Sequence, residues 1–102
     1  MPISVNHDSS ADEVTLMLGK NFDFNCVDEF RRAYENVEIE DKTSFVVDLR
    51  RTQYMDSSAL GMLINMHKLW AGNNRIIKII NANVQIRKIF TISRFDKKFK
   101  IV

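Results

Sequence analysis

The strongest constraint on the fold is a change of pattern in the middle of the chain. Residues 44–49 read SFVVDL, an apolar run that only Asp48 interrupts. So continuous a run is typical of a strand that is covered on both faces. Residues 57–71 then read as a helix that is apolar around most of its circumference. A buried strand followed by a buried helix predicts an α/β domain.

A narrow polar stripe follows one side of this predicted helix, and it consists of Gly61, Asn65 and Lys68, continued by Gly72. Glycine costs about 1 kcal/mol relative to alanine inside a helix. Gly61 therefore predicts a close approach of another part of the backbone at that position.

Further strands and helices are predicted on either side of this unit. Including the central run, the predicted strands are residues 3–7, 14–18, 44–49, 75–80 and 99–102. The first two alternate apolar and polar residues and should form an antiparallel hairpin. One helix should begin after a cap at Asp23 or Asn25 and end near Asn36, and another should follow Asn81 or Asn83. We expect one domain over residues 1–102, with a sheet that is mostly parallel beyond the hairpin.

Composition narrows the class of protein. Of 102 residues, 45% are hydrophobic and 27% are charged, which is the usual balance of a soluble globular domain. The single Cys26 cannot form an internal disulfide, which fits the cytoplasm. No stretch is long enough to cross a bilayer, and the N-terminus does not resemble a signal peptide. The net charge of +2 does not require nucleic acid, and the basic excess in residues 87–100 predicts a solvated rim.

The sequence offers little to an enzyme. Three glycines cannot build a phosphate-binding or dinucleotide-binding loop. His7, His67 and Cys26 lack the short spacing of metal ligands. Ten residues of one helix, about 15 Å, separate Ser57 from His67, which excludes a nucleophile–base pair. We expect no catalytic residue, no metal and no cofactor.

The polar turn before the second predicted helix ends in Asp56-Ser57-Ser58. Spacing alone favours a structural role, with Asp56 or Ser57 as the N-cap of the helix. A serine at a helix N-terminus can also carry a phosphate, because the helix dipole tolerates the added charge of about −1.5 to −2.

The octapeptide Tyr54-Met55-Asp56-Ser57-Ser58-Ala59-Leu60-Gly61, preceded by the apolar strand, resembles the signature of the STAS domain, specifically that of bacterial anti-sigma-factor antagonists. Further matches are Gly19, Phe22-Asp23, Val84, Arg87, Ile89 and Phe90. The chain departs from the family at Ala59, where glycine is usual, and it stops where the family commonly adds a fourth helix.

The resemblance implies a mixed sheet of about five strands with three helices packed mainly on one side. It implies that Ser57, directly after the aspartate, is phosphorylated, with Ser58 as the secondary candidate. The kinase would be the partner anti-sigma factor itself, a serine kinase of the histidine-kinase-like ATPase type. The unphosphorylated form would bind this partner and release the sigma factor, and a metal-dependent serine phosphatase would reverse the modification. Neither nucleic acid nor a membrane is implied.

The expected partner surface includes the turn and one exposed flank of the second long helix. Its residues are Asp23, Phe24, Tyr54, Met55, Asp56, Ser58, Met62, Asn65 and Met66. Two alternatives stay open. The domain could bind a small anion, nucleotide or lipid at the helix N-terminus, with Ser57 only as a cap, or it could regulate a pathway that has no sigma factor.

Overall fold

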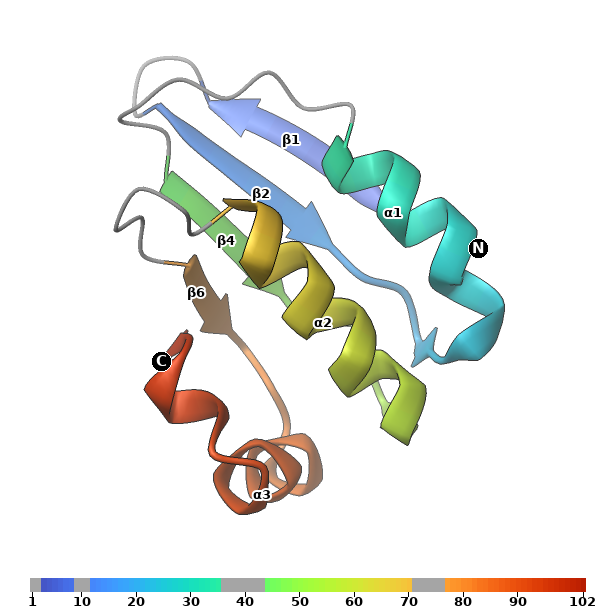
Figure 1. Cartoon of the computed structure of the whole chain (residues 1–102), viewed down its shortest axis with the longest axis vertical. Coiled ribbons are helices and arrows are strands. Elements are labelled where there is room, and N and C mark those ends of the chain that lie inside the picture. Colours follow the sequence, from blue (N-terminus) through green and yellow to red (C-terminus); the bar gives the residue numbers. More distant parts are fainter. Residues whose placement is uncertain (1–2, 9–11, 36–43, 71–76) are drawn as a thin grey trace.

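A five-stranded mixed sheet forms the framework of the molecule (Figure 1). The computed structural model describes residues 3–8, 12–35, 44–70 and 77–102. In spatial order the strands are β1 (Ser4–Asp8), β2 (Glu13–Met17), β4 (Ser44–Asp48), β6 (Ile77–Ile80) and β7 (Lys100–Ile101). β1 pairs with β2 as an antiparallel hairpin, and the other three pairs are parallel. The predicted hairpin and the predicted parallel part of the sheet are both confirmed.

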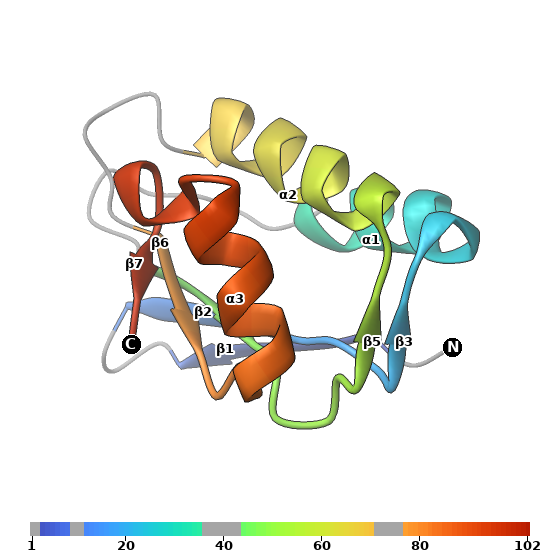
Figure 2. The same ribbon diagram turned by 90° about the horizontal axis from the view of Figure 1, so that it is seen from below.

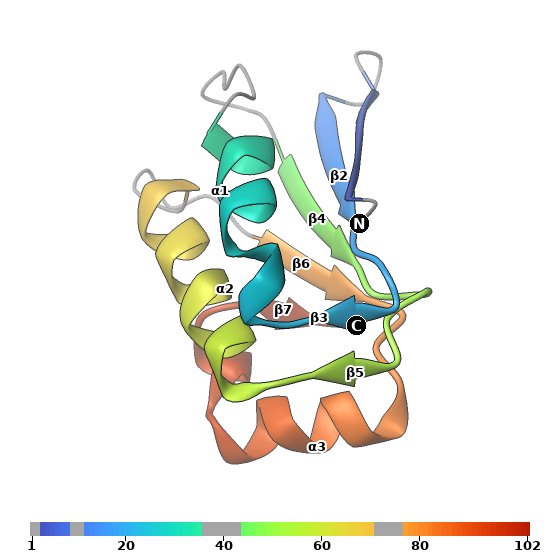
Figure 3. The ribbon, with the colours of Figure 1, turned by 90° about the vertical axis from the view of Figure 1, so that its right-hand side faces the viewer.

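The described residues form three α-helices, which are α1 (Val27–Glu35), α2 (Ser57–Trp70) and α3 (Val84–Ile92). Seen edge-on, α1 and α2 lie side by side over the same face of the sheet (Figure 3). α3 lies beside the end of the sheet that β6 and β7 form (Figure 2). Two short 3₁₀ turns also form. One is η1 (Phe24–Cys26), which follows strand β3 (Asn21–Phe22), and the other is η2 (Phe95–Lys97), which follows α3. The prediction of three helices mainly on one side is confirmed.

β4 lies in the middle of the sheet, and four of its five residues are buried, as its apolar run predicts. Phe45 and Val47 belong to the core beneath the helices. Val46 points to the opposite face and is still only 4% exposed. It is flanked in register by Thr15 and Lys78 of the neighbouring strands. Because register neighbours point to the same face, these two side chains help to shield Val46.

Trp70, at the end of α2, joins three elements in the core. Its ring stacks on Phe45 of β4 with 3.5 Å between centroids, and it meets Tyr34 of α1 edge-on at 5.8 Å. Its indole Nε1–H donates to the backbone carbonyl of Tyr34 at 3.2 Å. The buried indole thus has both apolar contacts and a partner for its polar group, as such side chains require.

A second, two-stranded sheet pairs β3 (Asn21–Phe22) with β5 (Tyr54–Met55) in parallel, and the sequence did not predict it. The amides of Gln53 and Tyr54 both donate to the carbonyl of Lys20, at 2.8 and 3.1 Å. The small sheet therefore places the start of α2 beside η1.

Some predictions fall outside the described residues: the loop at 38–42, the helix end at 72–74 and the start of the strand at 75. None of the helices in the described ranges combines the length and the apolar character that crossing a membrane requires.

Candidate functional site

The turn that leads from β4 to α2 is held by buried polar side chains. Asp48, only 4% exposed, accepts hydrogen bonds from the amide of Arg50 at 2.9 Å and from Asn81 Nδ2 at 3.1 Å. The hydroxyl of Thr52, 2% exposed, donates to the carbonyl of Gly19 at 2.9 Å. Buried polar groups with partners of this kind are costly to disturb, so they fix the path of the turn.

Asp56 is the N-cap of α2. Its Oδ1 accepts from the amide of Ala59 at 3.1 Å and from the hydroxyl of Ser58 at 2.6 Å. Its Oδ2 accepts from the amide of Phe24 in η1 at 3.3 Å. One carboxylate thus satisfies a free helix amide and joins two segments. The hydrogen bond from the Ser58 hydroxyl is the main cause that lowers the pKa of Asp56, so the carboxyl is ionised at neutral pH.

The two serines differ in the state of their hydroxyls. Ser57 is the first residue of α2, and its side chain is exposed. Within the part of the chain that the structure describes, no group forms a hydrogen bond with its hydroxyl. The hydroxyl of Ser58 is instead engaged by Asp56. Only the Ser57 hydroxyl is therefore free to contact another molecule or to be modified.

Two exposed aromatic rings flank this position. Phe24 in η1 is 67% exposed, and Tyr54 in β5 is 54% exposed. Aromatic side chains are enriched where proteins bind one another. Asp23 is half-buried and accepts from the amide of Asn25 at 3.0 Å, so this candidate caps η1, the 3₁₀ turn that precedes α1.

The expectation of an exposed flank at Met62 and Met66 is wrong. Met62 is 6% exposed and Met66 is fully buried, because both lie on the side of α2 that packs in the core. Met55 is likewise 6% exposed, so its side chain does not reach the surface that was expected to bind a partner. Asn65 is exposed, as the predicted polar stripe requires.

Gly61 also differs from the expectation. Apart from the backbone of its own helix, a Cβ placed on Gly61 would meet no atom of the described residues within 4 Å, so no close approach within this part of the chain explains the glycine. The residue is exposed and lies one helical turn after Ser57. Together, Ser57, Gly61 and Asn65 form an exposed stripe along α2, and at Gly61 no side chain covers the backbone.

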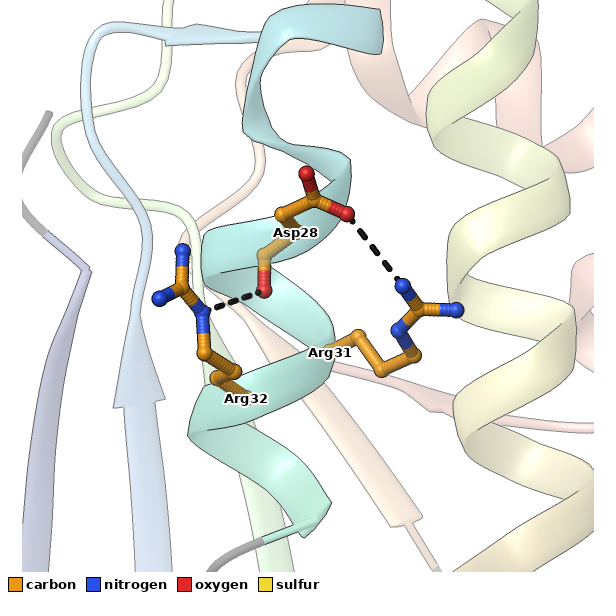
Figure 4. Close-up of polar contacts among 3 residues, drawn as sticks. All are labelled: Asp28, Arg31 and Arg32. Carbon is orange, nitrogen blue, oxygen red and sulfur yellow. Dashed lines mark hydrogen bonds and ion pairs between the residues drawn. The ribbon is translucent and has the colours of Figure 1, made fainter.

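Beside this stripe, a groove of about 50 Å³ separates α2 from α1. It is lined by Val27, Phe30, Arg31, Tyr34, Met62 and Asn65. Figure 4 shows Arg31 extending toward α2 while its guanidinium pairs with Asp28 at 3.2 Å. Arg32, on the other side, donates to the carbonyl of Asp28 at 3.3 Å. Sequence reasoning did not single out Arg31, since its place in the groove beside α2 depends on how the two helices pack.

The candidate metal ligands have structural partners. His67 Nε2 lies 3.0 Å from the carbonyl of Lys98, and its ring packs on Phe99. The thiol of buried Cys26 donates to the carbonyl of Asn21 at 3.3 Å. The described residues contain no group of three or more His, Cys, Asp or Glu that could hold a metal ion.

Known proteins match the chain over nearly its whole length. A family model described as "Mlab, STAS domain" matches residues 5–102. A STAS-domain containing protein of Pseudomonas aeruginosa (strain UCBPP-PA14) is 41% identical over 101 residues, which is 99% of each chain.

Solved structures share the fold at lower identity. An anti-sigma factor antagonist from Mycobacterium paratuberculosis superposes with a TM-score of 0.78 at 15% identity, covering 98% of this chain and 85% of that one. The phosphorylated form of SpoIIAA from Bacillus gives 0.73 at 16% identity, covering 99% and 91%. A sulfate transporter family protein from Wolinella succinogenes gives 0.71 at 13% identity, covering 89% and 78%.

Proposed function

From its membership of the STAS domain family, we propose that this chain is a cytoplasmic regulator and not an enzyme. Phosphorylation of Ser57 switches its binding to a partner protein. The unphosphorylated form binds an anti-sigma factor that is also a serine kinase of the histidine-kinase-like ATPase type, and the sigma factor is released. Phosphorylation blocks this binding, and a metal-dependent serine phosphatase restores it. The observation that carries the proposal is the exposed, unbonded hydroxyl of Ser57 at the start of α2.

The hydrogen bonds favour Ser57 over Ser58 as the acceptor. A kinase must reach a free hydroxyl, and phosphorylation of Ser58 would first require its 2.6 Å hydrogen bond to Asp56 to break. Two solved structures of SpoIIAA, an anti-sigma factor antagonist of the same fold, represent its unphosphorylated and phosphorylated forms. They support a phosphorylation switch in this fold.

Charge is the proposed blocking mechanism. A phosphate on Ser57 adds about −1.5 to −2 charge beside the ionised carboxylate of Asp56. The helix itself tolerates an anion at its N-terminus. A partner that is complementary to a neutral hydroxyl does not, because the new charge would be desolvated without a counterion. A hundredfold loss of affinity needs only about 2.7 kcal/mol.

The proposed partner surface surrounds Ser57 and is smaller than the sequence suggested. Its exposed or half-exposed members are Asp23, Phe24, Tyr54, Asp56, Ser58 and Asn65. The exposed rings of Phe24 and Tyr54 supply its apolar area.

The test is a binding measurement with three variants. The partner is first recovered with Ser57→Ala as bait and then titrated calorimetrically with the whole chain. We expect Ser57→Ala to bind as tightly as the unphosphorylated wild type, and Ser57→Glu to bind about 100-fold more weakly. Ser58→Ala is the matched control and should still acquire one phosphate, by intact mass, when kinase and ATP are added. Equal affinity of wild type and Ser57→Glu would refute the switch.

Of two other functions, one is disfavoured and the other is compatible with the fold. Binding of a small anion, nucleotide or lipid at the start of α2 is disfavoured, because the carboxylate of Asp56 already occupies that end of the helix. A regulator without a sigma factor is compatible with the fold, which a sulfate transporter family protein shares. The identity of the protein captured by Ser57→Ala distinguishes this output from the leading one.

A further inference from the structure

The outer face of α3 exposes two large aliphatic side chains. Val84 is 68% exposed and Ile92 is 82% exposed. They lie eight residues apart, about two helical turns, and so share one side of the helix. Single exposed aliphatic residues are ordinary, but a pair on one helix face around a groove marks a surface that can bind another molecule.

The groove along this face has a volume of about 390 Å³. Its lining residues are Val84, Arg87, Lys88, Thr91 and Ile92. A second groove of about 300 Å³ shares Arg87 and Thr91, is also lined by acidic Asp96, and reaches Ile101 of β7. The outer face of α3 is therefore continuous with the neighbouring edge of the sheet, which Figure 2 shows beside α3.

The lining of the larger groove includes two basic residues and no acidic one. Residues 84–102 contain six lysines and arginines and only one acidic residue, Asp96, whereas the whole chain carries +2. Arg87 and Lys88 lie between the two aliphatic residues and are exposed. In the ranges that the structure describes, neither side chain forms an ion pair. Their charges are thus available to a ligand.

From this combination we infer that the outer face of α3 is a second docking site, which binds an acidic segment of a partner protein through aliphatic side chains at helical spacing. The basic pair selects negative charge, and Val84 and Ile92 select aliphatic groups.

Other occupants fit the surface less well. A second copy packed face to face would bring like charges together. Nucleic acid would leave the two aliphatic residues without partners. A membrane-surface helix needs a larger apolar face with Trp, Phe or Leu, and this one exposes only Val84 and Ile92 as large apolar residues.

The site is independent of the proposed switch, because it uses no residue of the surface around Ser57. A partner bound at α3 should therefore remain bound whether or not Ser57 is modified. An experiment can therefore refute the docking site at α3 without refuting the switch at Ser57, and the reverse.

Crosslinking in the native cells tests the occupant. Benzoylphenylalanine replaces Ile92 in the full chain, and mass spectrometry maps the crosslinked peptide, with the same probe at exposed Lys78 of β6 as a control. We expect a net acidic segment with aliphatic residues at helical spacing, and about a tenfold lower yield when Arg87→Glu and Lys88→Glu are combined. A crosslink to a second copy, a lipid or nucleic acid, no crosslink, or an unchanged yield would overturn the inference.

A peptide titration then measures how much the basic side chains and the aliphatic side chains each contribute to binding. A synthetic peptide of the crosslinked segment should shift the amide resonances of α3, and its Kd should rise about tenfold in the charge-reversed variant. Val84→Ser and Ile92→Ser should each weaken binding, and Ser57→Glu should leave Kd unchanged. All substituted positions are exposed, so equal unfolding midpoints show that the fold is intact. A Kd that changes with Ser57→Glu but not with the charge reversal would contradict the site.

Discussion

At Asp56 one carboxylate joins η1 to the first turn of α2, and its ionisation is coupled to folding. The lowered pKa means that the folded protein binds this proton less tightly than the unfolded chain. The resulting stabilisation is present at neutral pH and is lost as the pH falls through the folded-state pKa.

Replacement of this carboxylate should therefore have a pH-dependent effect. We expect Asp56→Ala to lower the urea midpoint at pH 7, because the amide of Ala59 and the hydroxyl of Ser58 lose their acceptor. The difference from wild type should narrow as the pH is lowered. Urea unfolding of both proteins between pH 7 and pH 3 measures it, and a difference that does not depend on pH would contradict the role of the charge.

Thr52 gives a second prediction about a single residue. Thr52→Val keeps the shape of the side chain but removes the hydroxyl that donates to Gly19. We expect the free energy of unfolding to fall by about 1 kcal/mol, measured by urea unfolding. Thr52→Ser keeps the hydroxyl and is the matched control. An unchanged stability of Thr52→Val would show that this hydrogen bond does not hold the turn.

Among the elements, α2 contains an interior glycine that makes the helix less stable than alanine at the same position would. Gly61 lies in its interior, and a methyl group there would meet no other element among the described residues. Gly61→Ala should therefore raise the free energy of unfolding by up to about 1 kcal/mol. If the partner packs closely on the uncovered backbone, the same substitution should weaken its binding. Urea unfolding and calorimetry measure the two effects.

Lys68→Ala is the control for Gly61→Ala, because Lys68 is an exposed residue of the same helix that lies outside the proposed partner surface. A less stable Gly61→Ala protein would refute the argument from helix propensity. A more stable protein with unchanged affinity would show that the partner does not approach the helix at this point.

Elements with clear periodicity could be predicted from the sequence, and those fixed by contacts between distant residues could not. The apolar run of β4 and the polar stripe of α2 both lie where the pattern placed them. β3 and β5 have two residues each, too few to show a period. The burial of Met62 and Met66 depends on which side of a largely apolar helix meets the sheet, and hydrophobicity alone does not decide that.

For the whole molecule, Trp70 is the natural reporter of unfolding. It is the only tryptophan in the chain, it is fully buried, and it contacts residues of α1 and β4. We expect its fluorescence and the far-UV circular dichroism to change with the same urea midpoint, as in a two-state transition. An earlier fluorescence transition would show that the helices separate from the sheet before the secondary structure is lost.

From the sequence, the candidate site could be located only to the turn that precedes α2. The order of strand, turn and helix placed Asp56, Ser57 and Ser58 together. The pattern could not say which residue is the cap, because Asp and Ser are both good N-caps. The contact of Asp56 with Phe24 joins residues 32 positions apart in the chain, and no local pattern contains it.

The hydrogen bond between Ser58 and Asp56 has a genetic consequence. Two adjacent serines suggest redundancy, in which the loss of one acceptor is compensated by the other. Because the Ser58 hydroxyl already donates its hydrogen bond to the cap residue Asp56, only Ser57 of the pair should act as a phosphate acceptor. A cell that carries Ser57→Ala should therefore behave as if the switch were permanently unmodified, and a second substitution at Ser58 should add no further signalling phenotype.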